Sequence, residues 1–341
     1  MTENINKQSF VSIIVISKDR HNELQKAVLS LMNLEYPSDR YEVVVVEEGD
    51  EPMPLKGVKY VFLPRRNLGL GYARNTGVRN AQGEIIAFTD DDCLVDPAWL
   101  REIIAGFKNP DVAGVAGATF TQGGSAIGIC EDMLGFPGGG HRRYHQSRGQ
   151  TSETNLLSGC NCAYRKEVFD RLSFKEDGYG RLGADDCLMG ITVARDHKCL
   201  YAPSAVVYHK SRGSLQRIVT WFTRRRINEL FFEETDAGRK NYRSFLTRPH
   251  RVVLLRLAAI LLLPLGFGWY GLLAVLLIGA AWYLFIFFRT LPLARYFSNW
   301  RALFLVPIVR VFMDVGVMIA EWKYLTRNHE TLQRSLSEYG R

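Results

Sequence analysis

The chain lacks the features that mark a secreted protein or a zinc-finger protein. Residues 1–9 are polar and contain no apolar core, so we expect no cleavable secretory signal. The six cysteines show neither a CxxC pair nor a Cys/His spacing typical of zinc sites. Cys160 and Cys162 are one residue apart, and packing explains them more simply than metal binding does. Reduced cysteines on a cytosolic face fit this usage better than a disulfide framework.

The sequence also lacks internal repeats and a recognisable nucleic-acid-binding module, although its net charge is +8. Many of its basic residues lie between residues 210 and 251, directly before a long apolar run. Basic flanks of this kind are attracted to anionic lipid and tend to stay on the cytoplasmic side of a membrane. We therefore expect membrane lipids, and not nucleic acid, to be the partner of this charge.

Two apolar runs are present, at residues 252–288 and 303–320. As one helix the first would be on the order of 55 Å long, against about 30 Å for the core of a bilayer. We therefore expect a helical hairpin that is broken near Pro264, Gly266 and Gly268.

The second run is less simple, because it contains Arg310 and Asp314 one helical turn apart. These two residues can pair inside the segment. If the run spanned a bilayer, the charged tail after it would lie outside, which fits the charge rule poorly. We favour two spans followed by an interfacial or partly inserted helix.

Strand-like and helix-like patterns alternate along residues 10–208, which predicts an α/β fold with a doubly wound, mostly parallel sheet. Strands are expected at residues 10–16, 41–46, 58–63, 84–90, 112–120, 157–164 and 199–208, and helices at 19–32, 71–81, 97–107, 166–172 and 185–195. The pattern fails between residues 121 and 154, where the Gly-rich basic segment 138–145 is expected to be a mobile loop. Residues 218–232 suit a helix that lies on a membrane surface.

Three consecutive carboxylates, Asp90, Asp91 and Asp92, close one of the expected strands. Open α/β folds bind ligands at the carboxyl edge of the sheet. Like charges this close are costly unless something compensates them, and a hard divalent cation bridging to phosphate is a common compensation. The alternative is a solvated acidic turn.

Four sequence blocks, in order, resemble family 2 glycosyltransferases, which are nucleotide-sugar-dependent enzymes of the GT-A fold. They are Val11-Ser12-Ile13-Ile14-Val15-Ile16; Asn67-Leu68-Gly69-Leu70-Gly71-Tyr72-Ala73-Arg74-Asn75-Thr76-Gly77; Phe88-Thr89-Asp90-Asp91-Asp92 with Pro97; and Gly183-Ala184-Asp185-Asp186 leading to residues 201–209. The resemblance covers residues 10 to 210 and implies a GT-A catalytic domain followed by membrane-associated helices.

The resemblance implies a divalent metal, Mn²⁺ or Mg²⁺, at the acidic triplet. Asp92 would bind the ion, and Asp90 would lie nearer the ribose or the metal-bound waters. His209 occupies the position where many members of the family supply a further metal ligand; a hydrogen-bonded residue at a strand end is the alternative. Asp91 is the member of the triplet expected to tolerate substitution best.

Inverting transfer to a hydroxyl requires a carboxylate base on the acceptor side. The family's Glu-Asp pair aligns without gaps with Ala184-Asp185, which makes Asp185 the base. A slip of one residue would make Asp186 the base instead. A capping role at the start of a helix is compatible with either residue.

The resemblance assigns nucleotide binding to residues at several strand ends and at the following helix. They are Ser17, Glu47, Glu48, Asn67, Arg74 and Asp90. Where the family usually has Asp-Asp-Gly-Ser, this chain has Glu-Glu-Gly-Asp, which leaves the identity of the base open. An arginine in the second block can pair with a diphosphate or position the acid that binds the base.

The Gln-x-x-Arg-Trp motif of processive synthases does not follow His209, which favours transfer of a single sugar. The expected organisation is a catalytic domain at 1–212, interfacial helices at 213–251, membrane-associated helices at 252–322 and a polar tail at 323–341. The predicted protein is a multi-pass plasma-membrane glycosyltransferase with its catalytic domain in the cytoplasm. Its expected acceptor is a lipid-linked glycan or a polysaccharide precursor. Direct transfer to polyprenyl phosphate, a soluble acceptor with plain anchoring, and a non-catalytic nucleotide-binding scaffold are the alternatives.

Overall fold

The computed structural model describes residues 9–176, 185–233 and 243–326. It divides into two compact units. The first, a sheet unit, contains the described residues from 9 to 122 and from 137 to 210. The second, a helical unit, contains residues 123–136, 211–233 and 243–326. The grouping of 123–136 with the C-terminal helices was not indicated by the sequence pattern. Residues 1–8, Gly183 and Ala184 of the fourth block, and the tail from 327 onward lie outside the described residues.

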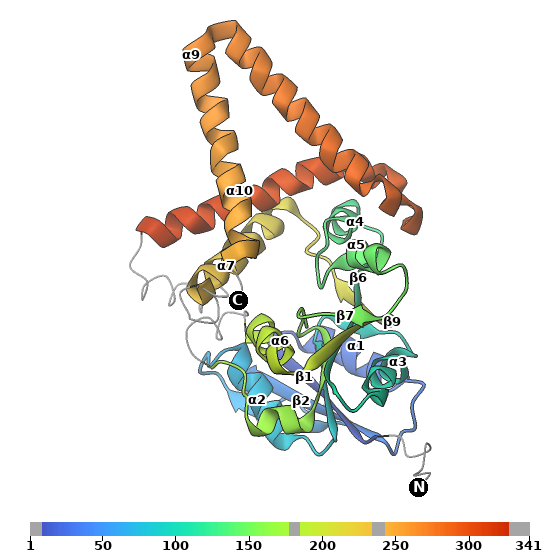
Figure 1. Ribbon diagram of the computed structural model, residues 1–341. Helices are drawn as coiled ribbons and strands as arrows, with labels where there is room; N and C mark the ends of the chain where they lie inside the picture. Colours follow the sequence, from blue (N-terminus) through green and yellow to red (C-terminus); the bar gives the residue numbers. More distant parts are fainter. Residues whose placement is uncertain (1–8, 177–184, 234–242, 327–341) are drawn as a thin grey trace. The chain divides into compact units, whose positions relative to one another are not determined.

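The sheet unit is built on a mixed sheet, in which the described residues form nine strands. Its order is β3-β2-β1-β4-β8-β6-β9-β5, with β7 paired to β9. The strands are β1 (Val11–Lys18), β2 (Tyr41–Gly49), β3 (Lys59–Pro64), β4 (Ile85–Asp90), β5 (Cys93–Val95), β6 (Val112–Gln122), β7 (Ser152–Glu153), β8 (Asn161–Arg165) and β9 (Lys198–Lys210). Strands β3, β2, β1 and β4 are parallel, as are β6 and β9, whereas β8 runs antiparallel between β4 and β6. The expected α/β fold with a mostly parallel sheet is confirmed (Figure 1).

Helices cover both faces of this sheet. They are α1 (His21–Leu31), α2 (Leu70–Asn80), α3 (Trp99–Ala105), η1 (Gly106–Lys108), α5 (Gly140–Ser147), η2 (Lys166–Asp170) and α6 (Asp185–Asp196). Alternate residues of each central strand serve opposite cores: Ile13 packs in the core that contains Leu24 of α1, and Ile14 in the core that contains Met189 of α6. Burial of one such side chain stabilises the fold by roughly 1.5–3 kcal/mol. The continuous β-branched runs of β1 and β2 are therefore those of strands buried on both faces.

Residues 138–145 were expected to form a mobile loop, and that prediction is wrong. Most of this segment lies in helix α5. Residues Gly138 and Gly139 have positive φ and allow the turn that leads into α5. The ring of His141 then stacks on Phe120 of β6 at 3.9 Å, and the guanidinium of Arg143 lies 3.9 Å from the ring of Tyr201. These contacts with distant strands hold a helix that the local sequence does not favour.

The helical unit contains α4 (Ala126–Met133), α7 (Leu215–Glu233), α9 (Arg243–Thr290), η4 (Leu291–Tyr296), η5 (Trp300–Leu305) and α10 (Val306–Thr326). The long α9 is broken at Gly268, where φ is 53° and ψ is −129°, so the expected break is confirmed and two arms meet there (Figure 1). Among the described residues, two helices are long and apolar enough to cross a membrane, Ile260–Tyr296 and Trp300–Thr326. In their most apolar windows 11% and 44% of the residues are buried, so α10 is much more covered by protein than α9.

Helix α10 packs along α7. A Cβ atom added to Gly316 would lie 2.6 Å from the carbonyl oxygen of Val219, so the two backbones approach closely. The hydroxyl of Thr223 donates to the carbonyl of Gly316 at 3.0 Å. Within α10, Arg310 Nη2 lies 2.9 Å from Asp314 Oδ1, which confirms the pair expected inside this segment.

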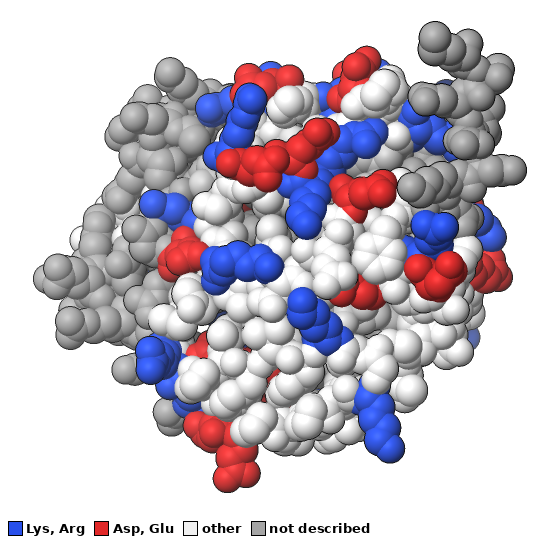
Figure 2. All heavy atoms as spheres, turned by 90° about the horizontal axis from the view of Figure 1, so that it is seen from below, with Lys and Arg blue, Asp and Glu red and all other residues white. Residues whose placement is uncertain are grey.

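Figure 2 shows the face that lies at the bottom of Figure 1. On this face the acidic and basic side chains are interspersed and are not gathered by sign. The net positive charge of the chain therefore does not form a patch on this face.

Candidate active site

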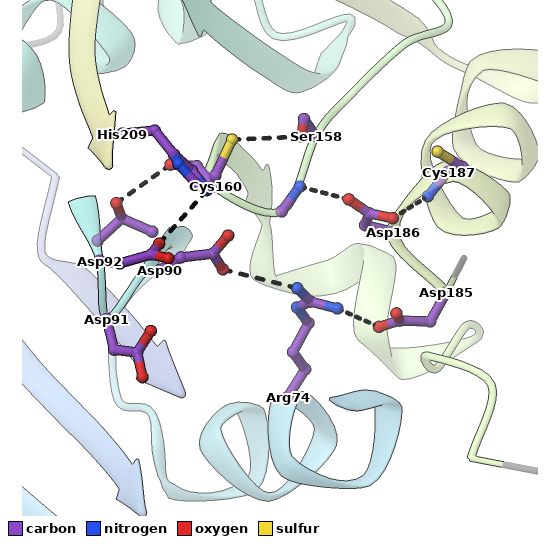
Figure 3. A network of polar contacts seen from close by, with 12 residues as sticks. Arg74, Asp90, Asp91, Asp92, Ser158, Cys160, Asp185, Asp186, Cys187 and His209 are labelled. Atoms are coloured by element: carbon purple, nitrogen blue, oxygen red, sulfur yellow. Dashed lines mark hydrogen bonds and ion pairs between the residues drawn. The ribbon is translucent and has the colours of Figure 1, made fainter. Parts of the chain in front are cut away.

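The three carboxylates that follow β4 have different environments. Asp91 is only 5% exposed; it accepts hydrogen bonds from Ser17 Oγ at 2.8 Å and from Arg20 Nη1 at 3.0 Å. Burial raises the pKa of Asp91 to about 7, against the opposing effect of Arg20. In Figure 3 its carboxylate points away from those of Asp90 and Asp92. The structure argues against the expectation that Asp91 is the most tolerant of the three, because it ties β4 to the end of β1.

Asp90 and Asp92 lie close to His209, as expected, and also to Cys93, which the sequence did not single out. The potential ligand atoms of Asp90, Asp92, Cys93 and His209 all lie within 4.8 Å of one another. Cys93 is placed there because β5 pairs with β9 in a register that sets Cys93 opposite His209. Strand β5 has three residues, too few for a period to be visible in the sequence, although Cys93 directly follows the triplet.

The donor set fits a divalent cation. His209 Nδ1 lies 2.7 Å from the carbonyl oxygen of Lys210 and donates to it, so a neutral ring presents its Nε2 lone pair. That Nε2 lies 3.3 Å from Asp92 Oδ1, which is also an acceptor. Two acceptors at this separation need a proton or a cation between them. Carboxylate oxygens with one imidazole suit Mn²⁺ or Mg²⁺.

Arg74 of α2 connects the triplet to the start of α6. It is 5% exposed, its Nη1 donates to Asp185 Oδ2, and its Nη2 lies 3.8 Å from Asp90 Oδ1 (Figure 3). Its guanidinium also lies 5.7 Å from the ring centre of Phe174. The nearby carboxylates raise the pKa of Arg74 in spite of its burial, so the side chain stays charged.

The two carboxylates that begin α6 are bonded differently. Asp186 accepts backbone hydrogen bonds at both oxygens, from Gly159 and from Cys187, each at 2.8 Å. Asp185 is fully buried, and its Oδ1 has no hydrogen-bond partner among the described residues. Burial raises the pKa of Asp185 to about 6; Arg74 opposes this shift and Asp186 adds to it. Asp185 therefore has an unsatisfied oxygen and a pKa close to neutrality, and Asp186 is engaged at both oxygens.

A cleft of about 550 Å³ opens beside the carboxyl ends of β1 and β2. It is lined by Asp19, Arg20, His21, Asn22, Glu23, Glu47, Glu48, Gly49, Asp50, Glu51, Met53 and Arg65. We call Asp90, Asp92, Cys93 and His209 the metal-type group. Arg20 also donates to Asp92 at 2.9 Å, so this one side chain borders both the cleft and the metal-type group. The sequence did not single out Arg20, and its place directly after β1 is the only signal that could have found it.

The residues expected to bind nucleotide lie in three different environments. Glu47 and Glu48 line the cleft, and Arg74 and Asp90 lie in the carboxylate network. Ser17 donates to Asp91. The side-chain oxygen of Asn67 accepts a hydrogen bond from Lys18, and its backbone N–H donates to Glu48. Ser17 and Asn67 therefore position neighbouring loops in this structure.

Part of the chain is similar to known proteins. Residues 12–173 match the family described as Glycosyl transferase family 2. The chain is 30% identical over 173 residues to the glycosyltransferase AglE of Haloferax volcanii, a match that covers 47% of this chain and 54% of the relative. It is 27% identical over 239 residues to the succinoglycan biosynthesis protein ExoO of Rhizobium meliloti, over 63% of this chain and 65% of the relative. The chain thus spans less than two thirds of either relative.

The fold is also found among solved structures. The mannosyltransferase PcManGT from Pyrobaculum calidifontis, solved in complex with GDP-Man and Mn²⁺, superposes with a TM-score of 0.59 at 18% identity. The match covers 92% of this chain and 88% of that chain. At 18% identity this similarity establishes the fold and nothing further.

Proposed function

Because this chain belongs to glycosyl transferase family 2 through residues 12–173, we propose that it is an inverting, divalent-metal-dependent glycosyltransferase. It would move one sugar from a nucleotide-sugar donor to an acceptor hydroxyl. One observation carries the proposal: Arg74 joins the metal-type group at Asp90 and Asp92 to the buried carboxylate of Asp185 (Figure 3). The groups needed for the two halves of the reaction thus meet in one network.

The acidic triplet Asp90–Asp92 would stabilise the leaving group. Asp90, Asp92 and His209 would hold Mn²⁺ or Mg²⁺, and a bound divalent cation neutralises the charge that develops on a departing nucleoside diphosphate. Arg20 fixes the orientation of Asp92 by a hydrogen bond of 2.9 Å. Asp91 contributes indirectly, because it holds Arg20 and Ser17 in place. A preorganised group of this kind needs little rearrangement during the reaction.

Asp185 would activate the acceptor hydroxyl as the general base. Arg74 holds its Oδ2, which leaves Oδ1 to accept a proton from the acceptor hydroxyl. Burial favours the protonated carboxyl that results, and this increases the basicity of a side chain that Arg74 would otherwise make a weak base. Asp186 holds the backbone of Gly159 and the first turn of α6, so we assign it a positioning role.

The helical unit supports a location at the cell membrane. Large apolar side chains of α9 are exposed, among them Leu265, Trp269 and Tyr270 at 83%, 83% and 84%. An exposed apolar surface of this kind suits membrane lipid. We propose that the two arms of α9 span the membrane, that the sheet unit faces the cytoplasm, and that the acceptor is a lipid-linked glycan or a polysaccharide precursor. The name of the relative from Rhizobium meliloti, a succinoglycan biosynthesis protein, supports this class of acceptor.

We place α10 in the plane of the membrane surface. It shares a close contact at Gly316 with α7, a helix rich in arginine, and Arg226 of α7 lies 3.1 Å from Glu321 of α10. A helix that spans a bilayer could not keep this charged neighbour along its length. Its opposite face exposes Ile308, Val311 and Trp322, which suits the boundary between headgroups and acyl chains.

The test is a binding and turnover assay on purified full-length protein. Thermal shifts with UDP, GDP, dTDP and CMP, each with and without Mn²⁺, should show metal-dependent stabilisation by a nucleotide, and the matching sugar nucleotide should be turned over. The absence of turnover with every sugar nucleotide would contradict the proposal and favour a nucleotide-binding scaffold. If turnover survives replacement of both Asp185 and Asp186, the acceptor is already anionic, as a polyprenyl phosphate is, and the proposed base is wrong.

A further inference from the structure

One buried thiol lies against the acidic triplet. Cys93 of β5 is 1% exposed and directly follows Asp92 in the chain. Strand β5 pairs antiparallel with β9 in a register that sets Cys93 opposite His209. The Sγ atom of Cys93 lies within 4.8 Å of a potential ligand atom on each of Asp90, Asp92 and His209. The sheet therefore brings a sulfur atom to a group that was expected to contain only oxygen and nitrogen ligands.

Packing accounts for only one side of this side chain. Cys93 belongs to the core that also contains Trp99 and Val207, and an apolar residue of similar size would serve there equally well. On its other side are two carboxylates and an imidazole. A thiol is a weak hydrogen-bond donor and gains little from such acceptors, and a thiolate beside carboxylates is costly unless a cation compensates the charge. The polar side of this position therefore favours a sulfur atom that binds a cation.

The four potential ligand atoms are close enough to bind one ion. Around a tetrahedral Zn²⁺, with a bond of about 2.3 Å to sulfur and about 2.0 Å to oxygen or nitrogen, ligand atoms lie roughly 3.3–3.8 Å apart. The separations within this group do not exceed 4.8 Å, so shifts of roughly 1 Å bring all four atoms onto one ion. His209 Nε2 and Asp92 Oδ1, which are 3.3 Å apart, already have the separation of two ligands of one ion.

We infer that Cys93 is a ligand of the metal ion at this site and makes the site selective for thiophilic divalent cations; this inference rests on the metal dependence of the proposed function. Asp90, Asp92 and His209 alone present oxygen and nitrogen atoms, which suit both Mg²⁺ and Mn²⁺. A thiolate changes this preference, because sulfur ligands favour Zn²⁺ and Co²⁺, whereas Mg²⁺ is bound through oxygen. Mn²⁺ therefore binds more tightly than Mg²⁺ at this site, and Zn²⁺ more tightly than either.

Ligation exchanges the proton of the thiol for the metal ion. The S–H bond of Cys93 breaks, the proton passes to solvent, and the electron pair of the sulfur forms the bond to the cation. Contacts with neighbouring residues hold two of the other ligands in place. Arg20 donates to Asp92 at 2.9 Å, and His209 Nδ1 donates to the carbonyl oxygen of Lys210 at 2.7 Å. Partners of this kind orient metal ligands and raise the affinity for the ion.

The experiment is a titration of the reduced, chelator-treated full-length protein with Co²⁺, followed by absorption spectroscopy and calorimetry. A bond between Co²⁺ and a thiolate gives a charge-transfer band in the near ultraviolet, which oxygen and nitrogen ligands do not give. The wild-type protein should develop this band fully with equimolar Co²⁺. Equimolar binding of Co²⁺ without the band overturns the inference and leaves the proposed function standing; if no divalent cation binds, both fall.

Two serine variants separate Cys93 from a second buried thiol. Cys93→Ser should lose the band and bind Zn²⁺ at least about tenfold more weakly, whereas its affinity for Mg²⁺ should stay within about twofold of the wild-type value.

Cys160→Ser is the matched control and should keep both the band and the Zn²⁺ affinity. Cys160 is 3% exposed in the same core as Cys93, but its Sγ lies 3.3 Å from Ser158 Oγ and is not one of the four grouped atoms. A band that persists in Cys93→Ser, or an unchanged Zn²⁺ affinity of that variant, would show that the Cys93 thiol only packs in the core. If Cys93→Ser is unfolded, the band in Cys160→Ser decides: its presence supports the inference and its absence overturns it.

Discussion

Arg74 holds two carboxylates at once: its Nη1 donates to Asp185 Oδ2, and its Nη2 lies 3.8 Å from Asp90 Oδ1. Asp90 ends a central strand and Asp185 begins a helix, so one buried guanidinium joins two distant parts of the chain. In the proposed reaction these parts serve the leaving group and the acceptor. A change at Arg74 should therefore affect both.

Replacement of Asp185 by asparagine should abolish turnover, because an amide cannot take the proton of the acceptor hydroxyl. We expect a loss of at least about 100-fold in kcat, with nucleotide affinity retained. Calorimetry with the nucleotide and a transfer assay measure the two effects. Asp186→Asn is the comparison; a larger loss of kcat in that variant than in Asp185→Asn would exchange the roles of the two residues.

The rate of the wild-type enzyme should depend on pH in the acid range. The pKa of Asp185 is raised to about 6, and the base must be ionised, so turnover should decline as the pH falls through about 6. At pH 8 the carboxylate is fully ionised and the rate should be independent of this group. A pH–rate profile that stays flat down to pH 5 would exclude Asp185 as the base.

The conservative change Arg74→Lys should move that profile. Arg74 lowers the pKa of Asp185 against the effect of burial, and lysine cannot reproduce its two-sided contact. The acid limb of the pH–rate profile should therefore shift to higher pH. Arg74→Ala leaves Asp185 buried without its partner and should cost about 3–5 kcal/mol of stability, measured by denaturant unfolding. An unchanged acid limb in Arg74→Lys would show that the pair does not tune the base.

Asp91→Ala should lower the free energy of unfolding by about 1–3 kcal/mol, because it leaves Ser17 and Arg20 without a buried partner. Asp92→Asn, in contrast, should mainly weaken Mn²⁺ binding, since Asp92 lies in the metal-type group. Denaturant unfolding and metal titration of both variants separate the two roles. Equal stability of Asp91→Ala and the wild type would show that Asp91 does not tie β4 to β1.

Gly316→Val should separate α10 from α7, because a Cβ atom at this position meets the carbonyl oxygen of Val219 at 2.6 Å. We expect a loss of about 1–3 kcal/mol, seen as a lower Tm of the detergent-purified protein. Gly279→Ala is the control, since nothing lies within 4 Å of a Cβ atom added there; alanine should be neutral or stabilise that helix by about 1 kcal/mol. If Gly316→Val left the Tm unchanged, the close contact with α7 would not be needed for stability.

Much of the fold and part of the site follow from local patterns in the chain. Buried strands can be predicted from their β-branched runs, and the carboxyl ends of parallel strands meet at one edge, which is where Asp90 and Asp92 were expected. His209 was expected beside them because of the resemblance to family 2 glycosyltransferases. The break at Gly268 was expected from the Pro264 to Gly268 cluster and the length limit of a bilayer. For the strands and for the helix break, the information lies within a few neighbouring residues.

The tertiary structure alone decided which partner each polar side chain takes. Asp91 proved to be the buried link to Ser17 and Arg20, and Cys93 joined the metal-type group through a strand of three residues. In the same way only the structure showed that Oδ1 of Asp185 has no hydrogen-bond partner among the described residues. The sequence by itself determined where charged groups stand along the chain and at which edge of the sheet they gather. Their partners, burial and pKa depend on contacts between residues far apart in the sequence, and only the packing of strands and helices brings these together.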